Sequence, residues 1–215
     1  MKCPELINIE LLSDTTFSSG RRSTGPVDIE IEHDEYGLPM LSGKTLHGLL
    51  RDGWLSMQEY FPDLRESGLR ILGCPGDLTE SSILRISDAA MDESVRRWAI
   101  HAIERKHSPH SSSAILNSLT DIRYQTSEER KTGAPAKAAL RSVRVVLHNH
   151  NDNLCLKSRL FWLDKPSAND LRCLALCVLS VRNAGLSRNR GRGWLRLTLD
   201  GDLGLTHTLA KGVEF

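Results

Sequence analysis

Three carboxylates alternate along a short stretch near the N-terminus and are the first residues that could do chemistry. Asp28, Glu30 and Glu32 are two positions apart, so in a β-strand their side chains would lie on one face. Such a row could bind a divalent cation through oxygen ligands, and one of its members could act as a general base. The same spacing is also typical of the solvent-exposed face of a strand, and the spacing alone favours that plainer interpretation.

A second candidate is a loop rich in glycine and arginine close to the C-terminus. The segment Gly185–Gly193 (GLSRNRGRG) contains three glycines and three arginines. Glycine lets a backbone amide come close to a phosphate, and arginine presents forked donors to phosphate oxygens. The segment is expected to lead from a helix into a strand, whereas a nucleotide cradle leads from a strand into a helix N-terminus. A loop that binds nucleic-acid phosphates and an ordinary solvated basic loop are both compatible with this composition.

Three other patterns are weaker. The segment Gly43-Lys-Thr45 resembles the end of a P-loop, but Leu38 stands where that motif requires glycine. His148 and His150 could share a strand face, yet no third metal ligand of matching spacing lies nearby. The two cysteines of LRCLALCVL, one helical turn apart, are expected to be small core residues.

The composition is that of a globular chain whose charge is segregated. The 215 residues are 40% hydrophobic and 26% charged, which argues against a disordered or membrane protein. We find no apolar signal core and no run of about 18 apolar residues, and the five cysteines lack CxxC spacing. We therefore expect a reduced, cytoplasmic protein.

The net charge is +1, but residues 130–151 hold five basic residues and no acid, and residues 171–199 hold six arginines and no acid. This segregation predicts a basic face that the net charge conceals.

Hydrophobic periodicity predicts the elements that would position these residues. Strands are expected at residues 5–12, 27–32, 83–87, 141–147, 154–163 and 194–199, and helices at 43–60, 92–106 and 171–182. Ser167 and Asp170 form a capping-box pattern before the last helix. Loops are expected at residues 18–25, 107–113 and 126–140. The order β–α–β–β–α–β predicts an α+β, ferredoxin-like (RRM-like) fold, as a single domain over residues 1–215 with an arm inserted at 121–147.

Three segments, in this order and separation, resemble the RAMP superfamily of CRISPR proteins, specifically the backbone subunit of type III effector complexes. The first runs from Thr24 to Arg51 and contains TGPVD, GLP and SGKTLHGLLR; the second is LRISDA, ending at Ala89; the third is the Gly185–Gly193 loop. The segment from Arg123 to Val145 also resembles the thumb hairpin of that family. The sequence differs from the family pattern at two places, where His47 and Leu41 stand instead of the usual lysine and proline.

The resemblance implies a specific activity. Subunits of this kind stack along a guide RNA, and each thumb displaces a base pair of the guide–target duplex at regular intervals. In cleaving members an Asp six residues before the turn Asp cuts the target RNA with a divalent metal. That position is Asp28 here, since the turn Asp matches Asp34. The resemblance therefore implies Asp28 as catalytic residue and metal ligand, with Mg²⁺ or Mn²⁺ as cofactor.

The resemblance and the charge map together indicate the RNA-binding residues and the partners. The residues expected to bind RNA are Arg21, Arg22, His47, Arg51, Lys131, Lys137, Arg188, Arg190 and Arg192. Contacts to the RNA backbone would suit a protein that holds guides of many sequences. The expected partners are a crRNA guide, complementary target RNA, copies of the chain itself and other type III effector subunits, with no membrane.

Three alternatives are compatible with the same residues. The chain could be a structural backbone subunit of the same kind of complex without chemistry. It could be a metal-independent endoribonuclease of the same superfamily that processes repeat RNA through histidine. Outside this biology, it could be a metabolic α+β enzyme that uses the carboxylate face and binds no RNA.

Overall fold

The main sheet of the domain has four antiparallel strands. The computed structural model describes residues 3–22, 27–74, 82–105, 110–136, 139–148 and 154–212. The sheet consists of β1 (Leu6–Leu11), β4 (Leu84–Ile86), β7 (Cys155–Trp162) and β8 (Leu195–Leu199), in the order β4-β7-β1-β8. The fourth, first, third and second strands of a β–α–β–β–α–β chain lie side by side in this way in a ferredoxin-like fold. The predicted α+β, ferredoxin-like fold is therefore confirmed.

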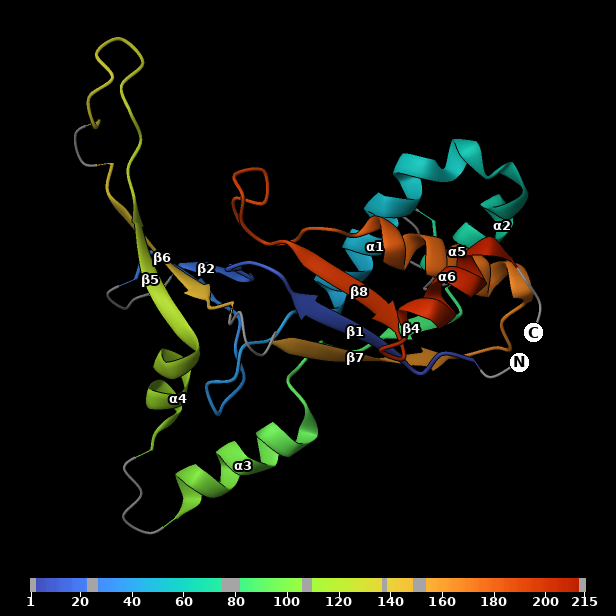
Figure 1. The fold of residues 1–215 in the computed structure, drawn as a ribbon, viewed down its shortest axis with the longest axis horizontal. Coiled ribbons are helices and arrows are strands. Elements are labelled where there is room, and N and C mark those ends of the chain that lie inside the picture. Colours follow the sequence, from blue (N-terminus) through green and yellow to red (C-terminus); the bar gives the residue numbers. More distant parts are fainter. Residues whose placement is uncertain are drawn as a thin grey trace.

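Helices cover one face of this sheet and enclose the core (Figure 1). They are α1 (Gly43–Met57), α2 (Arg65–Leu72), α5 (Ala168–Ser180) and α6 (Leu203–Lys211). In β1 every second side chain (Ile7, Ile9 and Leu11) is fully buried against this layer, as the alternating sequence predicts. Helix α5 begins with the expected capping box, in which Ser167 and Asp170 each accept from the other's backbone N–H.

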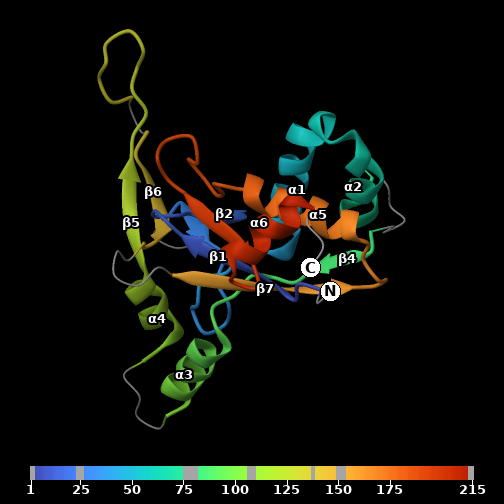
Figure 2. The same cartoon turned by 45° about the vertical axis from the view of Figure 1, so that its right-hand side comes forward.

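A second sheet is built from two insertions in the ferredoxin-like unit. Its strands are β2 (Ser18–Arg22), β3 (Ile29–Ile31), β5 (Thr120–Gln125) and β6 (Arg141–Val146), in the order β2-β3-β6-β5. β3 and β6 are parallel and meet at Ile29 and Val143, whereas β5 and β6 are antiparallel over their whole length. Between β5 and β6 the chain extends far from the body of the domain (Figures 1 and 2). We call residues 126–140 the arm.

Two further helices form a small lobe around a tight turn. The helices α3 (Glu93–Glu104) and α4 (Ser112–Leu119) share a minor core with the turn through Leu38, Ala99 and Ile115. Gly37 has a φ of +82°, and a Cβ there would collide with the backbone carbonyl of Ser112, so only glycine fits at this position. The turn that carries Asp34 is thus fixed against α4.

Several elements differ from the sequence expectation. β2 is a strand rather than part of a loop at 18–25, because its polar, glycine-containing segment pairs with β3 at the sheet edge; residues 23–26 lie outside the described residues. Helix α4 occupies the end of the segment expected to be a loop at 107–113, and begins after the Ser111 cap. α5 begins at Ala168 rather than 171. The helix expected over 43–60 ends at Met57 and is followed by the 3₁₀ turn η1 (Gln58–Tyr60). Helices α2 and α6 and the 3₁₀ turn η2 (Pro62–Leu64) were not expected.

Within the described part of the chain, none of the helices has the length and apolar character needed to cross a membrane.

Candidate functional site

Asp28 lies exposed directly before β3 and is bound by Ser142 of the neighbouring strand β6. Its Oδ2 accepts hydrogen bonds from the backbone N–H of Ser142 at 2.7 Å and from the Ser142 hydroxyl at 2.8 Å. The N–H of Asp28 in turn donates to Ser142 Oγ at 2.9 Å. The Ser142 backbone and side-chain bonds, with a further contribution from the charge of Arg141, lower the pKa of the Asp28 carboxyl below its usual value. Asp28 is therefore ionised at neutral pH.

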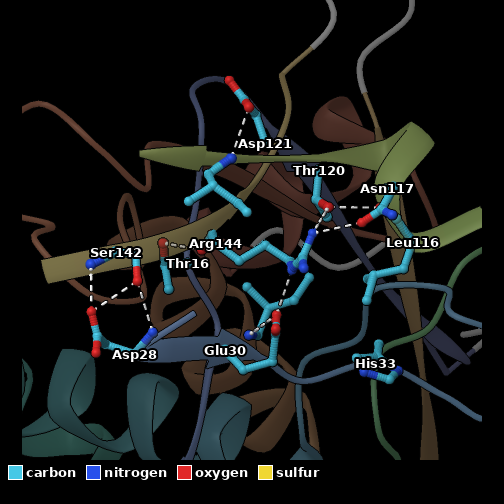
Figure 3. A network of polar contacts seen from close by, with 12 residues as sticks. Thr16, Asp28, Glu30, His33, Leu116, Asn117, Thr120, Asp121, Ser142 and Arg144 are labelled. Atoms are coloured by element: carbon cyan, nitrogen blue, oxygen red, sulfur yellow. Dashed lines mark hydrogen bonds and ion pairs between the residues drawn. The ribbon is translucent and has the colours of Figure 1, made fainter. Parts of the chain in front are cut away.

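Glu30 is engaged in a separate network (Figure 3). Its Oε1 lies 2.7 Å from Nε of Arg144, whose side chain is only 11% exposed. Nη1 of Arg144 also donates to Asn117 Oδ1 and to Thr120 Oγ1, both at 3.0 Å. Glu30 therefore holds β3 to β6 and α4, and is not an additional ligand beside Asp28.

The row of three carboxylates does not form a metal cluster by itself. Across the residues that the structure describes, no three His, Cys, Asp or Glu side chains gather closely enough to hold an ion. Any cation at Asp28 would have to take most of its ligands from water or substrate. Mg²⁺ commonly binds in this manner, through one or two carboxylates and the phosphates of its substrate, so the donor that Asp28 provides fits such an ion.

Two of the three glycines of the Gly185–Gly193 loop serve packing. Gly185 has a φ of +87°, and a Cβ there would lie 2.5 Å from the carbonyl oxygen of Thr16. Gly193 has a φ of +72°, and its Cβ would collide with the carbonyl oxygen of Ala184. Together with the hydrogen bond from Leu186 N–H to Thr16 O at 3.0 Å, these contacts fix the loop beside the second sheet. The sequence had suggested that the glycines admit phosphate, whereas these two instead admit the protein backbone.

Two adjoining hollows lie between this loop and the base of the arm. The first, of about 620 Å³, is lined by Gln125, Thr126, Ser127, Glu128, Arg130, Ala139, Arg141 and Arg190. The second, of about 450 Å³, is lined by Ile29, Gln125, Arg141, Val143 and residues 185–190. They share Gln125, Arg141 and Arg190. We call them the arginine hollows, because four arginines and only one carboxylate line the pair.

The arginine hollows combine residues from three distant parts of the sequence. Arg141 follows the arm, Arg188 and Arg190 belong to the glycine loop, and Ile29 belongs to β3. Asp28 lines neither hollow, but the adjacent Ile29 does, and Arg141 is close enough to influence the Asp28 carboxyl. This arrangement places a row of cations next to an ionised carboxylate.

A second cluster of basic side chains, Arg51 and Arg85 with His47 beside them, lies on α1 and β4. His47 and Arg51 are half-buried one turn apart, and one nitrogen of Arg51 (Nη2) is buried without a hydrogen-bond partner among the described residues. Burial, followed by the charges of Arg51 and Arg85, lowers the pKa of His47, so this histidine is neutral at neutral pH. The buried donor of Arg51 is suited to an anion that the described residues do not supply.

The start of α1 is fixed by the second segment of the family resemblance. Gly43 N–H donates to Asp88 Oδ1 at 2.7 Å, and a Cβ on Gly43 would collide with the backbone of Ile86. The Ser-Gly and Asp-Ala motifs thus lie against each other, although 45 residues separate Gly43 from Asp88 in the sequence. Their contact sets the position of His47 and Arg51.

The remaining expected RNA-binding residues are distributed as follows. Arg188 and Arg190 are exposed and Arg192 is half-buried, and Lys131 is exposed near the turn of the arm. The backbone of Arg21 and Arg22 lies in β2, but their side chains are not among those described. Lys137 and His150 lie outside the described residues. The cysteines Cys173 and Cys177 are fully buried in α5.

Sequence reasoning did not single out Arg130, Arg141, Ser142 or Arg85 as site residues. The first three lie in the acid-free run of residues 130–151, so the signal for them was the charge distribution rather than a motif. Arg85 lies in the LRISDA segment, and only its proximity to His47 connects it to a site.

The fold and the site together define a ferredoxin-like domain with an appended arm and a cationic surface able to bind a polyanion. The family model of the RAMP superfamily matches residues 8–196, and the chain belongs to this superfamily.

The comparisons with solved structures show the same fold. A chain from the cryo-EM structure of a type III-B Cmr-beta complex bound to cognate target RNA is 14% identical, with a TM-score of 0.65 and coverage of 99% of both chains. A chain from the apo state of Cmr-beta is also 14% identical, with a TM-score of 0.65 and coverage of 92% of this chain and 97% of the other. No curated protein matches the sequence.

Proposed function

We propose that the chain is a guide-RNA-binding backbone subunit of a type III CRISPR effector complex, and that it cleaves complementary target RNA with Asp28. The arginine hollows carry this proposal, because they offer guanidinium groups along a surface lined by backbone and small polar groups. The family and the similarity to Cmr-beta chains support it. Such a complex would act in the cytoplasm, where guides and transcripts meet.

The arginine hollows suit phosphodiesters rather than a small apolar ligand. Guanidinium groups bind phosphate oxygens through paired, charge-assisted hydrogen bonds. No hydrogen-bond or ion-pair partner of the guanidinium group of Arg141 or Arg190 is found among the described residues, so both side chains can engage RNA without first breaking an internal bond. Contacts of this kind hold any base sequence, and pairing with the guide then selects the target.

The arm would act as the thumb of the complex. Residues 126–136 are almost entirely exposed, and the paired strands β5 and β6 join them to the rest of the domain. An element projecting in this way can insert into a guide–target duplex and displace a base pair beside the site. Its base lines the larger arginine hollow, so the RNA next to the displaced pair would lie close to Asp28.

Asp28 is better suited to hold a cation than to remove a proton. Its hydrogen bonds lower the pKa, and a weakly basic carboxylate is a poor general base at neutral pH. Bound Mg²⁺ or Mn²⁺ would supply charge stabilisation at the scissile phosphate. The role of Asp28 is to hold this cation beside the RNA, while Arg141 and Arg190 orient the phosphodiester chain.

The experiment is co-expression of the chain with a CRISPR array and its neighbouring subunits, followed by target cleavage in Mg²⁺ or Mn²⁺. We expect a discrete guide RNA and evenly spaced target fragments from the wild type. Asp28→Asn should abolish the fragments and retain the guide, whereas Asp121→Asn, an exposed carboxylate on β5, should cut normally. Loss of guide RNA in the Asp28 variant would assign this residue a structural role instead.

One observation favours a backbone subunit without cleavage as the second candidate. Asp28 is absent from the lining of both arginine hollows, so RNA could bind there without reaching the carboxylate. A wild-type complex that holds guide and target but releases no fragments with either metal would establish this alternative. Exchange of both Arg141 and Arg190 for alanine should weaken RNA retention under both candidates.

A further inference from the structure

Among the described residues, the hydrogen bonds to the Asp28 carboxylate come from Ser142. Ser142 supplies two donors to Oδ2, one from its backbone and one from its hydroxyl, and its hydroxyl oxygen also accepts from Asp28 N–H. Figure 3 shows Oδ2 turned toward Ser142 and the other carboxylate oxygen turned away. A carboxylate bound by two donors at one oxygen loses much of its rotation, and its second oxygen keeps a defined direction.

We propose that Ser142 is a positioning residue for target cleavage, which holds Oδ2 of Asp28 so that Oδ1 faces the scissile RNA and its cation. The proposal rests on the cleavage function proposed above. Ser142 acts only through Asp28 and does not itself touch the RNA.

The part of the structure that is described around Asp28 provides little other restraint on its side chain. β3 is only three residues long and pairs with β6 through Ile29 and Val143. Asp28 precedes this strand and its side chain is exposed, so backbone pairing does not fix the carboxylate. Arg144, the next residue of β6 on the same strand face as Ser142, binds Glu30 instead. The two side chains of β6 thus serve different carboxylates, and Ser142 is the one committed to Asp28.

Residues that orient a functional ligand typically contribute about 10- to 100-fold to activity or metal affinity when removed. Ser142→Ala deletes the hydroxyl and retains the backbone donor, so the carboxylate loses one of its two donors. Ser142→Thr retains the hydroxyl and suits a strand. Ser158→Ala is a matched control, because it removes another buried strand hydroxyl, which donates to Ser87 O at 2.6 Å far along the sequence from Asp28.

The test uses the assembled, guide-loaded complex and measures three quantities for each variant: the single-turnover cleavage rate, the Kd for target RNA, and Mn²⁺ binding by electron paramagnetic resonance. For Ser142→Ala we expect a rate about 10- to 100-fold lower, weaker Mn²⁺ binding and an unchanged Kd for target RNA. Ser142→Thr should recover most of the rate, and Ser158→Ala should leave the rate and Mn²⁺ binding unchanged.

The positioning role alone would be overturned by wild-type cleavage of Ser142→Ala beside an inactive Asp28→Asn, or by equal slowing in Ser142→Ala and Ser158→Ala. Failure of threonine to recover either the rate or Mn²⁺ binding would also contradict it. Normal cleavage by Asp28→Asn would overturn both this role and the proposed cleavage function, since Ser142 would have no catalytic residue to position.

Discussion

The ion pair between Arg144 and Glu30 gives a quantitative test of how the second sheet is held to the lobe. The guanidinium of Arg144 is 11% exposed and the carboxylate of Glu30 is 21% exposed. Arg144→Ala removes this pair and the bonds to Asn117 and Thr120. Thr120 keeps its own bond to Leu116 O at 2.7 Å, so the main residual cost is a poorly solvated carboxylate at Glu30.

The expected magnitude follows from these exposures. Breaking a fully buried ion pair by removing one partner costs about 3–5 kcal/mol, and a hydrogen bond to a charged group is worth about 1.5–3 kcal/mol. Because water reaches part of Glu30, we expect Arg144→Ala to lower the free energy of unfolding by about 2–3 kcal/mol. Arg65→Ala is the control: its pair with Glu59 is 54% and 73% exposed, and such pairs contribute at most about 1 kcal/mol.

The assay is urea unfolding of the full chain, followed by circular dichroism. Comparable midpoints and slopes for Arg144→Ala and Arg65→Ala would refute the reasoning. A double variant, Arg144→Met with Glu30→Gln, removes both charges and should be less destabilised than the sum of the two single changes, because neither charge is then left unpaired.

Two further predictions concern the loop and the lobe. Gly185→Ala should destabilise the chain more than Gly191→Ala: both glycines have positive φ values, of +87° and +80°, but only the Cβ at 185 meets backbone. The positive φ costs each variant about 1–2 kcal/mol, and the collision adds to this cost only at position 185. Thermal unfolding of the two variants checks the order. The Lys157 ammonium and the Ser94 donors hold the pKa of Asp92 well below its usual range, so the stability that Asp92 contributes is present above about pH 4 and is lost as the pH falls further. Asp92→Asn should therefore flatten the acid limb of a pH–stability curve, and an unchanged acid limb would show that this pair is not coupled to folding.

Local patterns were sufficient to predict the ferredoxin-like unit. Alternating apolar residues predicted β1, an apolar run after a turn predicted β7, and Ser167 with Asp170 predicted the capping box of α5, since these signals depend on residues close in sequence. The same reasoning missed β2, whose segment SSGRR has no apolar alternation and becomes a strand only by pairing with β3. Helix α4 was missed because its sequence is short and rich in serine, and it is held in place by the minor core.

The candidate site was only partly predictable for a related reason. The family pattern identified Asp28, and the composition identified the glycine loop, each within a few residues. The contact of Asp28 with Ser142 spans 114 positions, and the arginine hollows combine β3, the arm and the glycine loop. Local sequence patterns do not predict contacts between residues so far apart in the chain. The partners of Asp28 and the packing role of Gly185 therefore emerged only from the folded structure.

The arm is joined to the domain by a ladder in which all six residues of β5 pair with all six of β6. Because this ladder fixes both ends of the arm, residues can be added to or removed from its tip without changing the register of the sheet. The entropic cost of a longer loop rises slowly, by about 0.6 kcal/mol for each doubling of its length. The reach of the arm is therefore open to evolutionary change at little expense to folding, while the hollows at its base keep their shape.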